Sequence, residues 1–351
     1  MDNVLSGADG YGVILLTCER SHRTIGPKWL ILCVFPWNIA GERRCNRGNV
    51  VPMMIALKAA MPQLPRTKAV ANHVVAVDET DSTNALAAQM ISDGSLTLPE
   101  RANGELSVAV VAADRQTAGR GRNGHKWVSQ PGRCSTMSYA VRIPRAIAAD
   151  ESVNGWLQMI AGLVTLDALN GMIEEYGAAP NQPDCLLELK WPNDVFCHGL
   201  KLGGLLSELV IPPSSGAEAA ADDDVVIVFG VGLNLALGAC RLPTPQSTSL
   251  QLHVTGLPSF GEMRDAVAER QVEGFRERLA KFIADPKGRA ESLREEMKAV
   301  CWARGRQVEA HFTDGTTLTG EAIGLNEDAS LILRTQDGAD HTVRTADVGV
   351  L

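Results

Sequence analysis

Apolar residues from residue 73 onward follow two rhythms, one typical of strands and one typical of helices. Short apolar runs predict strands at 74–77, 106–113, 138–143, 186–189, 204–210 and 225–229. Apolar residues at helical spacing predict one helix from Ser152 to Tyr176 and another from Met263 to Phe282. This order of elements predicts an α+β (α/β-type) domain over residues 73–300, with a mixed sheet packed on helices.

A further helix is predicted between the first two strands. An Ala- and Leu-rich run ends at Ile91, and it follows Asp81 and Ser82, either of which is a suitable N-cap. The strand before it and the cap together indicate a strand, a turn and a helix start in that order.

The last fifty residues have a different pattern. Short alternating segments at 308–312, 321–323, 331–333 and 341–343 are separated by turn signals such as Asp314-Gly315 and Asp337-Gly338. This spacing predicts a small antiparallel β-barrel, and we place a domain boundary at residue 301.

Residues 1–72 show neither rhythm for long, and they predict a poorly ordered N-terminal extension. A pair of amphipathic helices joined by a short turn, which a helix-turn-helix requires, is not visible there. The arginine content of residues 1–60 would also suit an organellar presequence, although Asp2, Asp9 and Glu19 argue against one. The expectation is therefore a cytoplasmic protein, with organellar targeting as the alternative.

Charge narrows the classes of partner. The 351 residues carry a formal net charge of -8, but residues 1–70 are net +5 and the remainder is net -13. An acidic body argues against binding to DNA, which depends on clustered positive charge. The apolar segment from Trp29 to Trp37 is too short to span a bilayer, so no membrane partner is expected.

The strongest local motif is the segment 116–127, Gln-Thr-Ala-Gly-Arg-Gly-Arg-Asn-Gly-His-Lys-Trp. Its three glycines allow close approach of the backbone to a ligand, and its three cations suit a phosphate or a carboxylate. Trp127 offers a face on which a base can stack. The motif lacks the Gly-Lys-Ser/Thr of a Walker A loop and does not read as the helix start of a Rossmann fingerprint. A solvated basic loop is the alternative, but its position after a buried strand in an acidic domain favours a binding loop.

Two further motifs follow. Lys190-Trp191-Pro192-Asn193-Asp194 precedes Lys201-Leu202-Gly203-Gly204, in which a lysine stands at a strand entrance where it can polarise a phosphoryl group. The segment 230–234, Gly-Val-Gly-Leu-Asn, ends an apolar strand, so either close backbone approach or a bulge is expected there. Taken singly, a turn and a surface lysine are the better explanations of the first of these motifs.

Together and in this order, the segments from Val74 to the C-terminus resemble the biotin protein ligases, also called biotin–acetyl-CoA-carboxylase ligases. The resemblance covers about four fifths of the chain. It implies a catalytic domain similar to the class II synthetase-like biotin and lipoate ligases, followed by an SH3-like domain over residues 301–351. It also implies that biotin and ATP are the substrates, that Mg²⁺ takes part, and that a biotin carboxyl carrier domain is the partner. A homodimer is compatible with the resemblance.

The resemblance also implies roles for individual residues. Lys201, Arg120 and Arg122 match the catalytic cations, and Asp194 matches a ligand of Mg²⁺. His125 is a departure, because many members of the family have arginine there. Residues that match biotin-binding positions are Ser82, Thr83, Asn84, Gln116, Arg120, Gly121, Arg122, Lys201, Gly203 and Gly204. Residues that match ATP-binding positions are Gly119, Arg122, Gly124, Trp127, Asn193, Asp194, Lys201 and Asn234.

Three other functions were weighed against this one. A lipoate or octanoate ligase would carry an Arg-Arg-x-Ser-Gly-Gly-Gly type segment, which the sequence lacks. A ligase that is also a DNA-binding repressor would need a winged helix-turn-helix before residue 73. A non-catalytic binding protein would be expected to have lost Lys201 or the arginines of the loop, and both are present.

Overall fold

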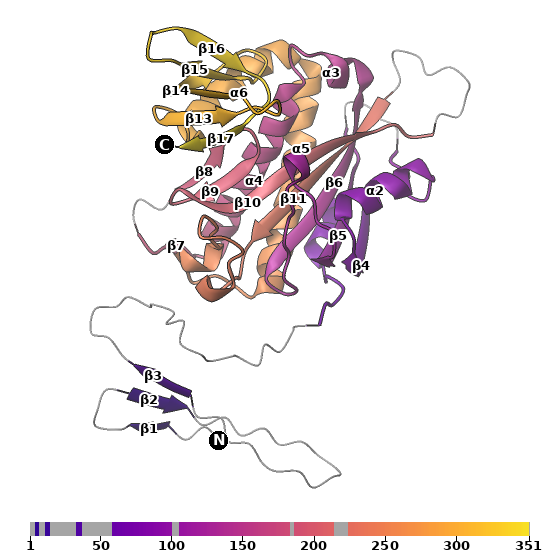
Figure 1. Cartoon of the computed structure of the whole chain (residues 1–351). Helices are drawn as coiled ribbons and strands as arrows, with labels where there is room; N and C mark the ends of the chain where they lie inside the picture. The colour runs from indigo at the N-terminus through magenta and orange to yellow at the C-terminus, as the bar shows by residue number, and fades with distance from the viewer. Residues whose placement is uncertain are drawn as a thin grey trace. The chain divides into compact units, whose positions relative to one another are not determined.

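The computed structural model describes residues 4–6, 11–14, 33–36, 58–99, 105–182, 186–213 and 224–350 (Figure 1). The chain divides into two compact units, residues 1–54 and residues 55–351. In the first, β1 (Val4–Ser6), β2 (Tyr11–Ile14) and β3 (Cys33–Pro36) form an antiparallel sheet in that order. Apart from these three strands, residues 1–57 lie outside the described residues, and so do the predictions of a presequence and of a poorly ordered extension that were made for them.

The second unit is built on a mixed seven-stranded sheet, as the strand pattern predicted. Only the first two strands in the order run parallel, and every other neighbouring pair is antiparallel. The order is β4 (His73–Thr80), β5 (Val108–Gln116), β6 (Cys134–Pro144), β11 (Asp224–Asn234), β10 (Leu200–Val210), β9 (Asp194–Cys197) and β8 (Leu187–Lys190). The central strands are covered on both faces, which explains the nearly continuous apolar sequences of β5 and β11.

Helices cover both faces of this sheet. On one face, α4 (Gly155–Glu175), α5 (Phe260–Ala284) and α6 (Pro286–Val300) bury the larger core. On the other face, α2 (Thr83–Ser92) packs its Ala87 and Ile91 on the sheet. Ser82 is its N-cap, which confirms the sequence prediction. Helix α6 was not predicted, because its first turn contains Pro286 and its buried stripe is narrow. Shorter elements are α3 (Arg145–Ala149), β7 (Ala179–Pro180) and β12 (Val254–Thr255).

Helix α4 is long and apolar enough to cross a membrane, a stretch that the sequence analysis passed over in favour of Trp29 to Trp37. In the structure, 72% of its most apolar window is buried inside the protein. It lies between the sheet and α5, so its apolar surface is accounted for by core packing.

The C-terminal residues form a separate five-stranded antiparallel sheet, an arrangement compatible with the SH3-like domain that the resemblance implied. Its order is β16 (Asp340–Val343), β15 (Leu331–Arg334), β14 (Thr317–Leu325), β13 (Gln307–His311) and β17 (Asp347–Val350). Strand β17 was missed from the sequence, since Val348 is the one apolar and buried side chain among those that the structure describes in it.

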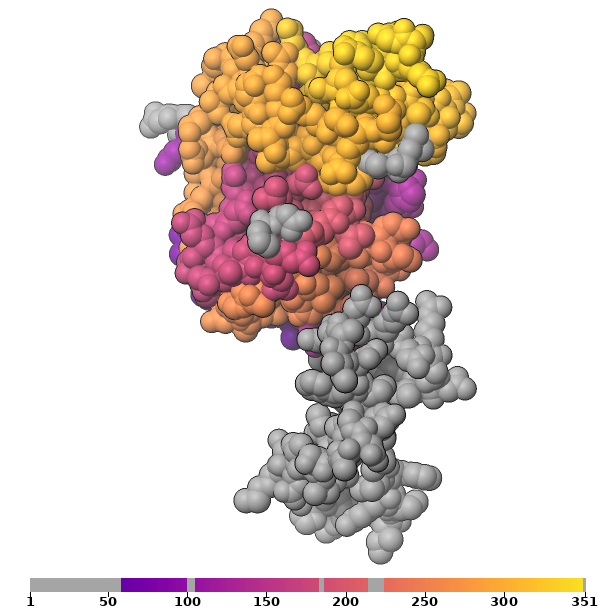
Figure 2. Space-filling model, turned by 90° about the vertical axis from the view of Figure 1, so that its left-hand side faces the viewer, coloured from indigo at the N-terminus to yellow at the C-terminus, as the bar shows by residue number. Residues whose placement is uncertain are grey.

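This C-terminal sheet is fixed to the larger sheet and its helices. The indole nitrogen of Trp156 donates to Glu327 O at 2.6 Å, and that of Trp191 donates to Ala329 O at 2.9 Å. The two parts share one continuous apolar core. Figure 2 shows the yellow C-terminal residues in direct contact with the orange helices.

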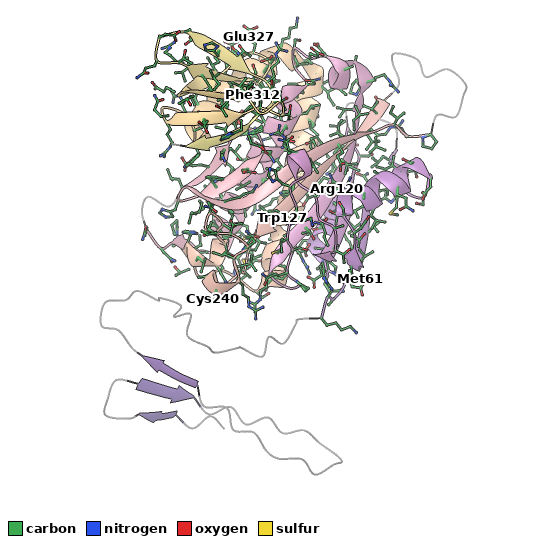
Figure 3. All side chains as sticks on the ribbon, viewed as in Figure 1. Met61, Arg120, Trp127, Cys240, Phe312 and Glu327 are labelled. Carbon is green, nitrogen blue, oxygen red and sulfur yellow. The ribbon has the colours of Figure 1, made fainter. Side chains whose placement is uncertain are left out.

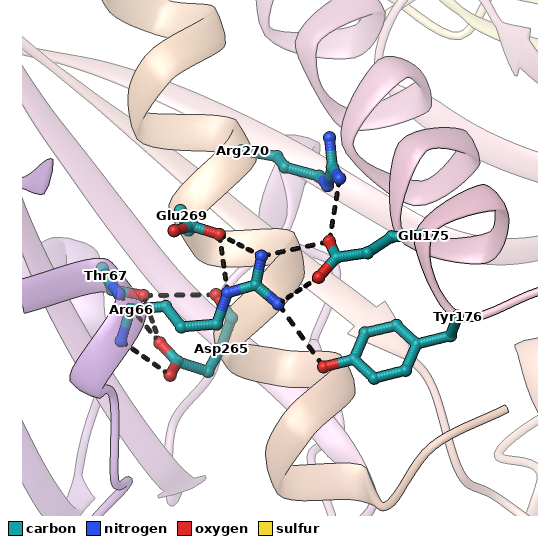
Figure 4. Close-up of polar contacts among 7 residues, drawn as sticks. All are labelled: Arg66, Thr67, Glu175, Tyr176, Asp265, Glu269 and Arg270. Carbon is teal, nitrogen blue, oxygen red and sulfur yellow. Dashed lines mark hydrogen bonds and ion pairs between the residues drawn. The ribbon is translucent and has the colours of Figure 1, made fainter. Parts of the chain in front are cut away.

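Residues 58–72, which the sequence analysis assigned to the extension, belong to the second unit. Helix α1 (Pro65–Val70) packs on α5, and Leu64 is buried in the core. The backbone N–H and the hydroxyl of Thr67 both donate to Asp265 Oδ1, at 2.9 and 2.8 Å (Figure 4). Arg66 pairs with Glu175 and Glu269. The ordered domain therefore begins before residue 73.

Two truncations test this earlier start. Deletion of residues 1–57 is expected to leave the free energy of unfolding close to that of the full chain. Deletion of residues 1–72 is expected to cost about 3 kcal/mol or more, because it leaves the buried carboxylate of Asp265 without its donors from α1. Urea unfolding of both variants measures the difference. Equal midpoints would show that α1 contributes nothing to the core.

Candidate active site

A cavity of about 480 Å³ lies against the larger sheet, and it brings together three motifs that are far apart in the sequence. Figure 3 shows Arg120 and Trp127, which come from the loop after β5, in front of the central strands. Twelve of the residues predicted from the sequence line the cavity: Ser82, Thr83, Asn84, Gln116, Arg120, Gly121, Arg122, Trp127, Asn193, Asp194, Lys201 and Gly204.

Four predicted residues do not line the cavity. Asn234 is buried, and its amide donates to Thr248 O at 3.0 Å, so it supports the neighbouring loop. A Cβ at Gly119 or Gly203 would lie 2.5 Å from a backbone oxygen, of Trp127 and of Gly232 respectively. These two glycines allow close packing of backbone segments. Gly124 has a φ of +76°, which a turn requires.

The segment Gly119–Trp127, here named the cation loop, is a short hairpin. Trp127 N donates to Gly119 O at 2.9 Å, and Gly121 N donates to His125 O at 2.7 Å. Its tip is one turn of 3₁₀-helix (Arg122–Gly124), in which Asn123 has a φ of +51°. The base of the loop is therefore held by its own backbone, and the tip projects its side chains away from it.

One end of the cavity is lined by side chains of α2 and β5, which belong to a polar network that extends to Ser138 of β6 and Glu208 of β10. The amide oxygen of Gln116 accepts from the backbone N–H of Thr83 at 2.7 Å. Ser138 Oγ lies 2.6 Å from Asn84 Oδ1, and the Asn84 amide donates to Glu208 at 2.7 Å. Sequence reasoning missed Ser138 and Glu208, because they lie inside strands with no motif around them. The network holds amide and hydroxyl groups at fixed positions, as recognition of a small polar ring requires.

The glycines of β11 explain how these side chains fit. A Cβ at Gly230 would lie 2.4 Å from Asn84 Oδ1, and a Cβ at Gly232 would lie 2.5 Å from Trp127 Cε2. Strand β11 keeps its register with both neighbours, so the sequence alternative of a bulge is wrong here. The close approach that was predicted does occur, and the approaching groups are an amide and an indole ring.

Cations gather at the other end of the cavity. Lys201 Nζ lies 2.7 Å from Asp194 Oδ1, and the Lys201 backbone is bonded on both sides to the segment 246–248. Arg122 Nη1 lies 3.5 Å from Asn193 Oδ1. Burial lowers the pKa of Arg122, although the negative charges of Asp347 and Asp194 act to raise it. Burial also lowers the pKa of Lys190, with the charge of Lys201 acting in the same direction.

This arrangement suits an anion that carries an apolar body. Arg120, Arg122 and Lys201 converge from the cation loop and β10, while Met137, Leu205 and Val231 supply apolar lining. Cations that acidic side chains do not fully neutralise stabilise a bound phosphate or carboxylate.

Three lining residues come from the C-terminal sheet, and the sequence analysis predicted none of them. They are His311, Asp347 and Val348. Asp347 Oδ2 accepts from Asn123 Nδ2 at 3.1 Å and lies 3.4 Å from His125 Nε2. Burial would raise the pKa of Asp347, but these two contacts and the charge of Arg122 outweigh it and lower the pKa. No local signal marks a residue more than 200 positions away from the loop it contacts.

Comparison with known proteins gives results that agree with the motifs. Residues 93–218 match the model of the biotin/lipoate A/B protein ligase family. The chain is 28% identical over 258 residues to a biotin–[acetyl-CoA-carboxylase] ligase of Mycobacterium tuberculosis, covering 73% of this chain and 81% of that one. It is 27% identical over 278 residues to a bifunctional ligase/repressor of Bacillus spizizenii, covering 78% of this chain and 73% of that one.

Solved structures share the fold. The biotin protein ligase from Aquifex aeolicus in complex with biotin and ATP superposes with a TM-score of 0.52 and 22% identity. The match covers 80% of this chain and 97% of that one. It confirms the fold class predicted from the sequence, a mixed sheet packed with helices.

Proposed function

We propose that the chain is a biotin protein ligase, which activates biotin to biotinyl-AMP and transfers the biotin to a lysine of a carboxylase carrier domain. The observation that carries the proposal is that Arg120, Arg122 and Lys201 line one cavity together with residues of the polar network, whose Glu208 lies 3.7 Å from Arg120. The relatives that act on acetyl-CoA carboxylase support the choice of partner.

The first step needs positive charge. A carboxylate oxygen of biotin attacks the α-phosphorus of ATP, the bond to the bridging oxygen breaks, and pyrophosphate leaves. Two anions must approach each other, which is unfavourable unless fixed cations stabilise the charge that develops. The backbone of Lys201 is held by hydrogen bonds on both sides, and its ammonium group is held by Asp194 at 2.7 Å.

The second step needs protection from water. Biotinyl-AMP is a mixed anhydride that hydrolyses readily, so the site must exclude water until the acceptor arrives. The cation loop lies over the cavity and carries Arg120 and Arg122. The ε-amine of the acceptor lysine then attacks the acyl carbon, AMP leaves, and the amine proton passes to solvent. The described residues need supply no nucleophile for either step.

Mg²⁺ is compatible with Asp194, the carboxylate that lies beside Lys201 in the cavity. The part of the chain that the structure describes contains no group of three or more His, Cys, Asp or Glu that would hold a metal by itself. Mg²⁺ usually takes one or two protein carboxylates and fills its other positions with phosphate oxygens and water. Asp194 would hold it, and the ion would offset charge on the phosphates of ATP.

Exchange of labelled pyrophosphate into ATP tests the proposal. We expect exchange that depends on biotin, with lipoate and octanoate at most weakly active. Exchange driven by lipoate or octanoate and not by biotin would assign the chain to the lipoate ligases. A second assay follows label from biotin into a purified carrier domain and into the same domain with its acceptor lysine replaced by arginine.

Substitution of Gly232, which lies against the ring of Trp127, tests whether Trp127 positions the nucleotide. Gly232→Ala places a methyl group 2.5 Å from the ring of Trp127, which must move. We expect a loss of roughly tenfold to a hundredfold in kcat/KM for ATP, because small displacements of positioning groups are costly. Gly324→Ala is the control, since nothing lies within 4 Å of its Cβ position. An equal kcat/KM in both variants would show that Trp127 does not position the nucleotide.

A further inference from the structure

The tip of the cation loop is held from outside the loop by one carboxylate. Among the described residues, the tip side chains make polar contacts beyond the loop with Asn193 and Asp347. The contact with Asn193 is long, at 3.5 Å. Asp347 contacts Asn123 of the tip and His125, the residue that follows the tip, through the same oxygen. The main support of the tip is therefore a residue of the C-terminal sheet.

Asp347 stands on a rigid base. It lies on β17 opposite His311 of β13, within the antiparallel ladder that joins these two strands. Trp156 and Trp191 fix the C-terminal sheet to the larger sheet and its helices through their indole hydrogen bonds. A Cβ at Gly155 would lie 2.4 Å from Asp328 O, so the two surfaces are in close contact there. A fixed carboxylate opposite a glycine-rich loop favours the closed position of that loop.

The charges around Asp347 are mostly positive. Arg122 and His125 interact with it from the cation loop, and Lys190 from β8. His311 is its cross-strand neighbour and also lies near Glu309. Removal of the carboxylate would leave cations facing one another across the mouth of the cavity, which adds repulsion to the loss of two hydrogen bonds.

We propose that Asp347 is a positioning residue, which holds the cation loop closed over the bound adenylate from the C-terminal sheet. The proposal rests on the proposed function for the identity of the ligand. The contact between Asp347 and the cation loop does not depend on the identity of the ligand. His125 takes part directly, so the residue that departs from the family pattern is here one partner of the contact.

Limited trypsin digestion of the protein without ligand tests the contact. The cation loop contains three cleavage sites, Arg120, Arg122 and Lys126, and cleavage follows the population of the open loop. Asp347→Ala is expected to be cut at these sites roughly tenfold faster than the wild type, as peptide mass spectrometry would show. Asp340→Ala is the matched control, because it also removes an exposed aspartate from the C-terminal sheet. Among the described residues, the carboxylate of Asp340 is hydrogen-bonded to Arg334 and not to the cation loop.

His125→Ala removes one of the two contacts of Asp347 from the loop side, so it serves if Asp347→Ala folds poorly. Cleavage of the double variant should match that of Asp347→Ala, because without the carboxylate His125 has no contact with Asp347 left to lose. Equal loop cleavage in wild type, Asp347→Ala and His125→Ala would overturn the proposal.

A second readout separates this proposal from the proposed function. Release of biotinyl-AMP from the enzyme, followed with labelled biotin, should be roughly tenfold faster in Asp347→Ala than in the Asp340→Ala control. Faster loop cleavage with unchanged release would overturn the role in holding the adenylate. If the wild type made no biotinyl-AMP at all, the proposed function would fail, while the cleavage result would still report on the contact.

Discussion

Lys201→Ala is expected to lower the rate of biotin-dependent pyrophosphate exchange by roughly 10²-fold or more, the cost of deleting one strong electrostatic contact in a preorganised site. Lys201 enters the cavity from β10, and its ammonium group lies 2.7 Å from Asp194. The loss should appear in kcat as well as in kcat/KM, because the negative charge develops during the step itself.

Two further variants make this result specific. Lys201→Arg keeps the charge but changes its position and should recover part of the rate. Lys281→Ala removes an exposed lysine on α5 and should exchange like the wild type. Thermal unfolding of each variant shows that the fold is retained. Normal exchange by a folded Lys201→Ala variant would remove Lys201 from the catalytic machinery.

The larger sheet and its main helices could be predicted because their burial is visible in the local pattern. Strands β5 and β11 are buried on both faces and have continuous apolar runs, and α4 carries apolar residues at helical spacing. Helix α1 was missed for the opposite reason. It has only six residues, and most of its attachment to α5 consists of hydrogen bonds and ion pairs, which leave no hydrophobic period in the sequence.

The site could be predicted as far as its residues stand in motifs. Arg120 comes from a loop whose residue types already indicated binding, whereas Lys201 and Asn84 were assigned through the family resemblance, and the fold brings all three to one cavity. Ser138 and Asp347 could not be found in this way. Each acts through a contact across the fold, to Asn84 and to the cation loop, and such pairing is decided by strand order and domain packing.

Arg122→Gly is expected to uncouple the two chemical steps. Arg122 lies at the tip of the cation loop, is half-buried, and interacts with Asp347 and Asn193. Its removal takes one cation from the cavity but also loosens the loop that covers the adenylate. Glycine adds backbone freedom next to Gly121 and Gly124, which increases the population of the open loop.

Retention of biotinyl-AMP should therefore suffer more than its formation. Since Lys201 and Arg120 remain, we expect pyrophosphate exchange to fall by roughly tenfold or less, while escape of the adenylate rises by a larger factor. Free biotinyl-AMP acylates exposed lysines without recognition, so an unrelated lysine-rich protein in the same tube should become labelled with biotin. Arg122→Lys, which keeps the charge without adding backbone freedom, should label it much less. Equal background labelling by wild type and Arg122→Gly, with normal biotinylation of the carrier domain, would show that Arg122 neither holds the loop nor retains the intermediate.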